Sequence, residues 1–406
     1  MKIIIISQWF DPEPTLKGLI FARALVKNGH EVQVITGFPN YPGGIVYDGY
    51  KIKFYQKEII DGVVIHRVPL YPSHDSSALK RVFNYMSFSF SSLLCGIFKA
   101  KKADVIYVYH PPITSGLVAL CVGKIRRIPV VIDIQDLWPD TLKATGMVNS
   151  EKLISIVSVF CGFIYKYVQD IVVLSPGFKE KLLSRGVSKE KISVIYNWAD
   201  ESSFLNPSVK TSVLPSKGFN VLFAGNIGRA QGIVSIIDAA LLLEKNNKNV
   251  NIVFVGGGVL LDTAKDYVTK LNVKNVFFIP RVSMQEVSGI INSADALLVH
   301  LIKNELFNIT IPSKTQSYLL AGKPIIMAVE GDAKDLVEVS KSGFFASPED
   351  SISLYDSFVN VSELPKEKLD LMGTNGKFFY FENLSQSVGV SKFEDVFLKA
   401  IENFNK

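Results

Sequence analysis

A glycine-rich stretch over residues 219–240 has the pattern of a phosphate-binding loop. An apolar run over 219–224 predicts a short buried strand, glycines at 225, 228 and 232 predict a tight turn, and isoleucines at 233, 236 and 237 fall at helical spacing. The first amides of a helix lack partners within it, and Arg229 places a positive charge beside them. The stretch is therefore a candidate diphosphate site. A plain strand-to-helix connection of an α/β sheet is the alternative.

A second group of polar residues follows two other apolar runs. Gln135 and Asp136 come directly after the run over 130–134, and His110 ends the run over 105–109. Parallel sheets bind ligands at the carboxyl ends of their strands, so these side chains are candidates for catalysis or for orienting a substrate. Asp136 could equally cap the next helix, and the two prolines after His110 allow a purely structural role.

We expect no metal ion to take part in the chemistry of this chain. No D-x-D triplet occurs anywhere, so no carboxylate pair is set up to hold a metal on a diphosphate. Charge on a leaving diphosphate would then be met by Arg229 and by helix dipoles. The sequence predicts no metal site and no cofactor.

Apolar runs that alternate with helical patterns must position these residues, and they occur in both halves of the chain. This alternation predicts two doubly wound parallel-sheet domains of the α/β class, with ligands bound in a cleft between the carboxyl ends of both sheets. The expected domains are 1–205 and 218–387, with a Ser-, Asn- and Pro-containing linker over 206–217. A closing helix over 388–406, after an irregular 382–386, is expected to pack back toward the first domain. The predicted strands are 2–7, 32–36, 63–68, 105–109, 130–134, 171–174, 192–196, 220–224, 251–255, 276–279, 296–301, 324–328 and 343–346.

Composition narrows the possible partners and the compartment. The 406 residues are 48% hydrophobic and 20% charged, enough for two sizeable cores. The net charge of +6 is spread along the chain, which favours acidic small molecules or an anionic membrane over nucleic acid. Three isolated cysteines indicate neither disulfides nor zinc and fit a reducing cytosol. No apolar run is long enough to predict a signal peptide or a membrane-spanning helix.

Seven motifs occur together in a fixed order: Gln8-Trp-Phe-Asp-Pro12 with Lys17-Gly18, Gly29-His-Glu-Val32, Thr36-Gly-Phe-Pro-Asn-Tyr-Pro42, Asp133-Ile-Gln-Asp-Leu-Trp-Pro139, the loop 225–232, Ile311-Pro-Ser-Lys314 and Ala321-Gly-Lys-Pro324. With these motifs, nearly the whole chain resembles the family-4 retaining glycosyltransferases of the GT-B fold. More narrowly, it resembles the bacterial enzymes of O-antigen and capsule assembly, and among them the L-fucosamine transferases. The resemblance implies metal-independent transfer of N-acetyl-L-fucosamine or a similar amino sugar from UDP to a lipid-linked acceptor. It also implies a cytoplasmic enzyme, peripheral at the inner face of the cell membrane.

The resemblance also assigns donor-binding residues. Arg229 stands at the family's diphosphate-binding Arg, Asn226 lies in the same loop, and Gln231 occupies the place of a family Lys. Lys314, next to Ser313, could supply the missing cation or could be a solvated surface residue. Gly18 would let backbone amides approach the donor phosphates, or it is a plain turn glycine. Arg281 and Val282 fall where the family holds the nucleotide base.

Two departures from the family pattern leave roles open. The family's Glu-x7-Glu motif aligns with Ile309 and Ser317, so both carboxylates are missing. Gln316 and Ser317 could bond a ribose hydroxyl instead, or Glu305 could substitute from another spacing. The family often has His where Gln135 stands. A nucleotide-sugar 2-epimerase of the same fold and a non-catalytic subunit of a polysaccharide-synthesis complex therefore remain alternatives.

Cations flank two apolar stretches in the first half, at 86–98 and 113–125. Such segments suit helices lying in an anionic membrane interface, or core helices with solvated ends. The flanking cations are Lys80, Arg81, Lys99, Lys101 and Lys102 for the first stretch and Lys124, Arg126 and Arg127 for the second.

Overall fold

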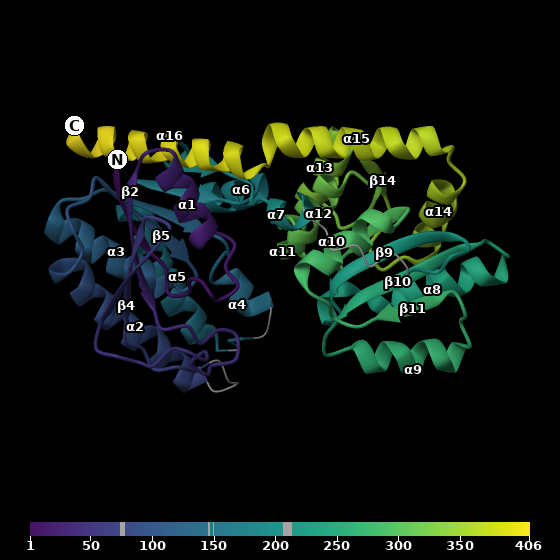
Figure 1. Cartoon of the computed structure of the whole chain (residues 1–406), viewed down its shortest axis with the longest axis horizontal. Helices are drawn as coiled ribbons and strands as arrows, with labels where there is room; N and C mark the ends of the chain where they lie inside the picture. The colour runs from purple at the N-terminus through teal and green to yellow at the C-terminus, as the bar shows by residue number, and fades with distance from the viewer. Residues whose placement is uncertain (74–77, 145–146, 149, 206–212) are drawn as a thin grey trace. The chain divides into compact units, whose positions relative to one another are not determined.

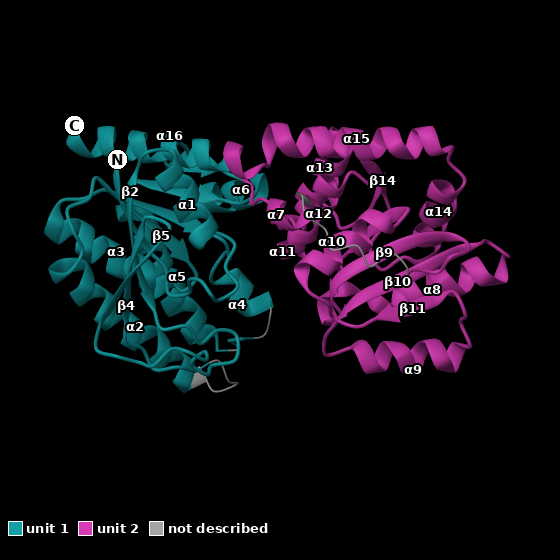
Figure 2. Ribbon diagram, in the orientation of Figure 1, with its two compact units in different colours: residues 1–195, 389–406 teal, residues 196–388 magenta. Residues whose placement is uncertain are grey.

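The chain forms two compact units in the computed structural model, which describes residues 1–73, 78–144, 147–148, 150–205 and 213–406 (Figure 1). Unit 1 contains residues 1–195 and 389–406, and unit 2 contains residues 196–388 (Figure 2). The first part of the expected linker, 206–212, lies outside the described residues.

The border between the units falls at residue 195, before the border expected at 205. The segment after 195 packs on helix α15 (Lys366–Asn383), because the amide of Ala199 donates to the Tyr380 hydroxyl (3.1 Å) and that hydroxyl donates to Glu201 (2.9 Å). These bonds assign the segment to unit 2.

An eight-stranded sheet forms the centre of unit 1, with the strand order β3-β4-β2-β1-β5-β6-β7-β8. All neighbours pair in parallel except β3 and β4. The sequence predicted every strand except β3, an edge strand whose exposed residues alternate with half-buried ones and which lacks a continuous apolar run. The strands are β1 (Lys2–Ile6), β2 (Glu31–Gly37), β3 (Gln56–Ile60), β4 (Val63–Val68), β5 (Val105–His110), β6 (Val130–Ile134), β7 (Asp170–Val173) and β8 (Ile192–Val194).

Helices cover both faces of this sheet. Tyr107 of β5 contacts Phe21 of α1 (Leu19–Lys27) and Phe393 of α16 (Gln386–Asn405), with ring centres 5.3 and 5.6 Å away. Its neighbour Ile106 points to the opposite face, where Gly123 of α3 (Ile113–Arg126) packs. Helix α3 lies between α2 (Ala78–Phe98) and α5 (Glu151–Tyr167) on that face. The shorter helices are α4 (Asp140–Ala144) and α6 (Pro176–Ser184).

A six-stranded parallel sheet with the order β11-β10-β9-β12-β13-β14 forms the centre of unit 2. Successive residues of β9 enter two separate hydrophobic cores, Leu222 one and Phe223 the other, so the predicted doubly wound α/β class is confirmed. The strands are β9 (Phe219–Asn226), β10 (Val250–Gly257), β11 (Val276–Ile279), β12 (Ala296–His300), β13 (Ile325–Ala328) and β14 (Gly343–Phe345). The helices, besides α15, are α7 (Glu201–Leu205), α8 (Ile233–Lys245), α9 (Leu261–Leu271), α10 (Met284–Ser293), α11 (Glu305–Asn308), α12 (Ser313–Ala321), α13 (Asp332–Ser340) and α14 (Ser351–Ser362).

Strand order reverses at β9 in unit 2 and at β1 in unit 1, because each has its next strand on one side and a later strand on the other. Ligands of doubly wound sheets bind at the carboxyl ends of strands beside such switch points. The irregular segment expected over 382–386 shrinks to residues 384–385 between α15 and α16. Among the described helices, none combines the length and apolar character that a membrane span requires.

Candidate active site

Two glycine loops meet at the switch point of unit 2. Gly225 and Gly256 face each other in register near the ends of the adjacent strands β9 and β10, and Gly258 follows β10. A Cβ atom on Gly256 would lie 2.0 Å from the Gly225 carbonyl oxygen, and one on Gly258 would lie 2.4 Å from that of Ile227. Only glycines allow this approach, so Gly256 and Gly258 serve the close packing of the two strand ends.

Gln231 closes the β9 loop instead of supplying a charge. Its Oε1 accepts a hydrogen bond from the Gly228 amide at 3.1 Å, within the short 3₁₀ turn Arg229–Gln231. Arg229 is exposed and makes no ion pair within the described residues. The next residue, Gly232, has φ +55° and leaves no room for a Cβ, which would lie 2.3 Å from His300. The loop is therefore held by neutral contacts, while its one cation remains available.

His300, at the end of β12, was not identified as a site residue from the sequence. Its ring is buried, its Nε2 accepts from the Glu349 amide at 3.1 Å, and burial lowers its pKa to about 4. The ring is therefore neutral near pH 7 and supports the start of α8.

Lys314 lies in an unusual place beside the β9 loop. Its Nζ sits 3.4 Å from the centre of the Phe223 ring, is shielded from solvent, and has no hydrogen-bond partner within the described residues. Burial lowers its pKa to about 7. A Cβ on Gly225 would lie only 3.4 Å from this Nζ, so the ammonium group adjoins the loop. One turn along α12, the Tyr318 hydroxyl accepts from the Ala224 amide at 2.8 Å and holds the helix against β9.

The other donor-side candidates differ in their surroundings. Asn226 is exposed, and its side-chain amide lies against Gly228 and Gly258. Gln316 is buried, and its Nε2 donates to the carbonyls of Pro312 (3.0 Å) and Ser313 (2.9 Å), so this group already has partners in its own helix. The exposed candidates are Arg281, Glu305 and Ser313, while Ser317 is half-buried and Val282 packs against a hydrophobic core.

A buried polar network lies beneath the candidate residues of unit 1. Asp133 of β6 receives hydrogen bonds from Lys17 and Tyr107 at one oxygen and from Gln135 at the other, all at 2.7 Å. Lys17 also lies 4.7 Å from the ring centre of Phe393 on α16. Burial lowers the pKa of Lys17, and the Asp133 carboxylate counters that effect. The network orients Gln135, and it was missed although a lone Asp in an apolar strand requires a buried partner.

Asp136 lies directly after this network. Helix α4 begins at Asp140, and no hydrogen bond to the Asp136 carboxylate occurs within the described residues, so the capping alternative has no support. Burial raises the pKa of Asp136. Burial raises the pKa values of Tyr41 and Tyr109, and the charge of the nearby Asp136 adds to both shifts.

His110 ends β5 and is fully buried. Its ring packs edge-on against Trp138 with centres 5.5 Å apart, and burial lowers its pKa to about 3. Neither ring nitrogen has a hydrogen-bond partner within the described residues. His110 is therefore a neutral ring with unused polar atoms.

The start of α1 is already occupied by a carboxylate of the chain. Asp11 accepts from the Leu19 amide at 2.6 Å, and a Cβ on Gly18 would lie 2.2 Å from both Asp11 and Thr15. The absence of a side chain at Gly18 is thus a steric need of this loop. Nearby, Glu13 accepts the amides of Phe10, Asn40 and Tyr41 at 2.8–2.9 Å and ties the loops after β1 and β2 together.

The arrangement offers anion binding in unit 2 and polar orientation in unit 1. Within the described parts of the chain, no three His, Cys, Asp or Glu side chains cluster as metal ligands would.

Comparison with known proteins finds one family domain in each half of the chain. Residues 20–198 match the glycosyl transferase 4-like domain, and residues 208–378 match the glycosyl transferases group 1 domain. WcaI of Escherichia coli K12, named as a colanic acid biosynthesis glycosyl transferase, is 26% identical over 344 residues, 81% of this chain and 84% of that protein. WbjE of Pseudomonas aeruginosa, named as a glycosyltransferase, is 24% identical and covers 78% of this chain and 79% of its own.

Two solved structures share the fold over almost the whole chain. HepE of Anabaena, in complex with UDP and glucose, superposes with a TM-score of 0.69 at 15% identity, over 97% of this chain and 98% of that chain. WaaG, a glycosyltransferase involved in lipopolysaccharide biosynthesis, superposes with a TM-score of 0.65 at 15% identity, over 97% and 99%. With both family domains in order on two parallel sheets, the chain belongs to the family-4/group 1 glycosyltransferases and has the GT-B fold.

Proposed function

We propose that the protein transfers a sugar, with retention and without a metal, from a UDP donor to a lipid-linked saccharide in bacterial surface-polysaccharide assembly. N-acetyl-L-fucosamine or a similar amino sugar is the proposed transferred sugar. WcaI and WaaG are both named for such pathways, and HepE was solved with UDP-glucose as well as with UDP and glucose. The motifs in the order described above support the same substrate class.

The observation that carries the donor half of this proposal is the unpaired ammonium group of Lys314. A buried cation without a counter-ion is costly, and it is retained where a ligand supplies the missing charge. The glycine loop, the exposed Arg229 and the first amides of α8 surround the same switch point. Together they would hold the diphosphate and stabilise its charge as it leaves the sugar.

Unit 1 supplies the groups proposed to orient the acceptor. Gln135 is fixed by Asp133, and Asp136 presents a carboxylate that accepts no hydrogen bond within the described chain. Retaining transfer passes through an oxocarbenium-like state, which a nearby carboxylate stabilises without acting as a strong base. We assign Asp136 this modest electrostatic and positioning role.

The test removes each donor-side cation separately. Arg229→Ala should lower kcat about 10²- to 10³-fold, because one preorganised donor to the leaving group is lost, and EDTA should leave both proteins unchanged. Lys314→Met should weaken UDP binding while the protein remains folded, since methionine fills the space over Phe223 without a charge. Product analysis completes the test. Activity of Arg229→Ala within threefold of the parent, or an epimerised nucleotide sugar as the product, would refute the proposal.

Contact with an anionic membrane is the second part of this proposal, and α2 supports it. Apolar side chains recur on its exposed side every three or four residues, while its other side packs on α3 and the sheet. The exposed side chains are Leu79, Val82, Phe83, Met86, Phe90, Leu94 and Phe98. The amphipathic pattern and the cations after the helix suit a helix in the membrane interface.

The test of this contact reverses the charge at the end of α2. A triple variant, Lys99→Glu, Lys101→Glu and Lys102→Glu, should lose binding to anionic vesicles at low salt, because each cation contributes about 1 kcal/mol. It should still use a short soluble acceptor analogue. Equal vesicle binding by variant and parent would remove this surface from the proposal.

A further inference from the structure

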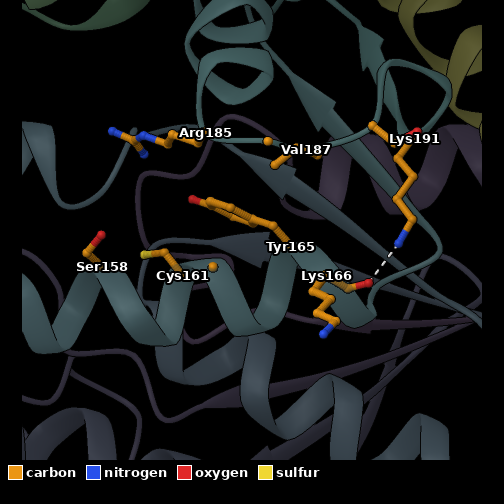
Figure 3. Close-up of a pocket in the computed structure, with 10 residues that line it drawn as sticks. Ser158, Cys161, Tyr165, Lys166, Arg185, Val187 and Lys191 are labelled. Atoms are coloured by element: carbon orange, nitrogen blue, oxygen red, sulfur yellow. Dashed lines mark hydrogen bonds between the residues drawn. The ribbon is translucent and has the colours of Figure 1, made fainter.

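Unit 1 contains a cavity of 660 Å³ that none of the functions above uses (Figure 3). One wall is the second half of α5, and the other is the segment 185–191 between α6 and β8. Figure 3 shows Tyr165 between these walls, with Arg185 on one side and Lys166 and Lys191 on the other.

The lining of this cavity is cationic. It contains Lys166, Arg185 and Lys191 and no carboxylate. Lys191 donates to the carbonyls of Lys166 (2.8 Å) and Val168 (2.9 Å), and Arg185 bonds the Trp138 carbonyl (3.1 Å) and Asp140, which lies outside the lining. Lys166 makes no ion pair within the described residues. Glu190 of the same segment is exposed and accepts a hydrogen bond from Ser188, which lines the cavity.

A buried tyrosine lies among these charges. Tyr165 is 3% exposed, yet its hydroxyl bonds no nitrogen or oxygen within the described residues and has the Cys161 thiol beside it. Burial raises the pKa of this hydroxyl, so it keeps its proton. An anion in the cavity would therefore meet three cations, of which Arg185 is paired with Asp140 and Lys191 bonds two carbonyls, while Lys166 has no ion pair within the described residues.

The helix that forms the wall is apolar around most of its circumference but is not covered. No charged residue occurs from 153 to 165, and in this stretch Cys161, Ile164 and Tyr165 are the buried residues. Lys152 and Lys166 flank it. A helix that is hydrophobic all round normally lies in a protein core or in lipid. The exposed apolar side chains are Leu153, Ile156, Val159, Phe160 and Phe163, with Val159 70% exposed.

We propose that the cavity and the exposed side of α5 bind one anionic phospholipid of the membrane surface. The headgroup phosphate occupies the cavity, and the acyl chains lie along α5. The proposal rests on the membrane contact proposed above and identifies a headgroup site within it. A volume of 660 Å³ suits a glycerophosphate group better than a single ion. A second copy of the chain would instead bring like charges together, since cations flank this apolar surface and none of the lining residues is acidic.

Gly162 provides the test, because it lines the cavity and a Cβ added there meets no atom within 4 Å. Gly162→Glu places a carboxylate in the cavity, and Gly162→Gln is the neutral control of the same size. Neither should impair folding, since both residues favour a helix more than glycine does. In co-sedimentation, the parent and Gly162→Gln should bind phosphatidylglycerol vesicles within twofold of each other. Gly162→Glu should bind at least tenfold more weakly, and none should bind phosphatidylcholine vesicles comparably.

The apolar half of the site is tested by Phe163→Ser, with the exposed Phe378 of unit 2 as the matched control position. Phe163→Ser should weaken vesicle binding about tenfold, because an aromatic ring buried in the acyl layer is lost, and Phe378→Ser should not. Equal binding by the Glu and Gln variants overturns the proposal, as does a lipid-free dimer of the parent that Phe163→Ser dissociates.

Transfer to a soluble acceptor analogue should be unchanged in all four variants. Failure of the parent in that assay would contradict the proposed transferase reaction, while the vesicle measurements would still decide the lipid site.

Discussion

Charged side chains at the carboxyl ends of the two central sheets have opposite surroundings. In unit 1, Lys17 and Asp133 are 1% and 0% exposed at their side chains and neutralise each other at 2.7 Å. In unit 2, the half-buried Lys314 has its ammonium group shielded beside an aromatic ring, and Arg229 is exposed; neither has a counter-ion within the described residues. An ion pair within the chain stabilises the loops that carry it, whereas a cation without a counter-ion is available to bind an anionic ligand. The contrast separates the paired framework of unit 1 from the anion site proposed for unit 2.

The largest expected effect on stability comes from breaking the Lys17–Asp133 ion pair of unit 1. Lys17→Met leaves the Asp133 carboxylate buried with hydrogen bonds from Tyr107 and Gln135 but without a cation. Removing one partner of a buried ion pair lowers the free energy of unfolding by about 3–5 kcal/mol. Urea denaturation of the variant measures this loss.

Two comparisons sharpen that result. The double variant Lys17→Met with Asp133→Asn should recover part of the stability, because no unpaired charge remains. Lys2→Met removes a cation that pairs with Glu31 at 3.7 Å on the surface, so it should have little effect. Similar losses for Lys17→Met and Lys2→Met would show that the buried pair is not a framework element.

Lys314 in unit 2 predicts that both stability and UDP affinity depend on pH. The pKa of Lys314 is about 7 in the folded protein and 10.5 for an ordinary lysine. Between these values the unfolded chain binds more protons, so the contribution of Lys314 to stability rises with pH over that range. A diphosphate requires the charged form, so UDP affinity should be highest below pH 7 and should fall up to about tenfold per pH unit above it.

Calorimetric titration of UDP from pH 6 to 9 measures this dependence. Lys314→Met should show a nearly flat profile above pH 7, which also controls for ionisation of UDP itself. Parallel profiles for the two proteins would mean that Lys314 does not meet the diphosphate.

Sequence patterns predicted the strands, which are local apolar runs. They missed the side-chain contacts between residues that lie far apart in the sequence. The run 130–134 matches β6 residue for residue, because buried parallel strands are continuous apolar runs. The partners of Asp133 lie far away in sequence, at residues 17 and 107, so no local pattern pairs them. Likewise, the choice between a solvated and a buried Lys314 depended on where α12 packs against β9.

The smallest predicted effect tests Asp136, which adjoins the paired network but accepts no hydrogen bond within the described chain. Asp136→Asn keeps the shape and removes the charge, so the melting temperature should stay the same or rise slightly, because burial disfavours the charged form. The transfer rate should fall about tenfold, which corresponds to about 1.4 kcal/mol of transition-state stabilisation. Both quantities are measured on one preparation. An unchanged rate would assign Asp136 to the framework with Asp133. A loss of rate at full stability would instead place it with Arg229 and Lys314, as a charge kept for the substrate.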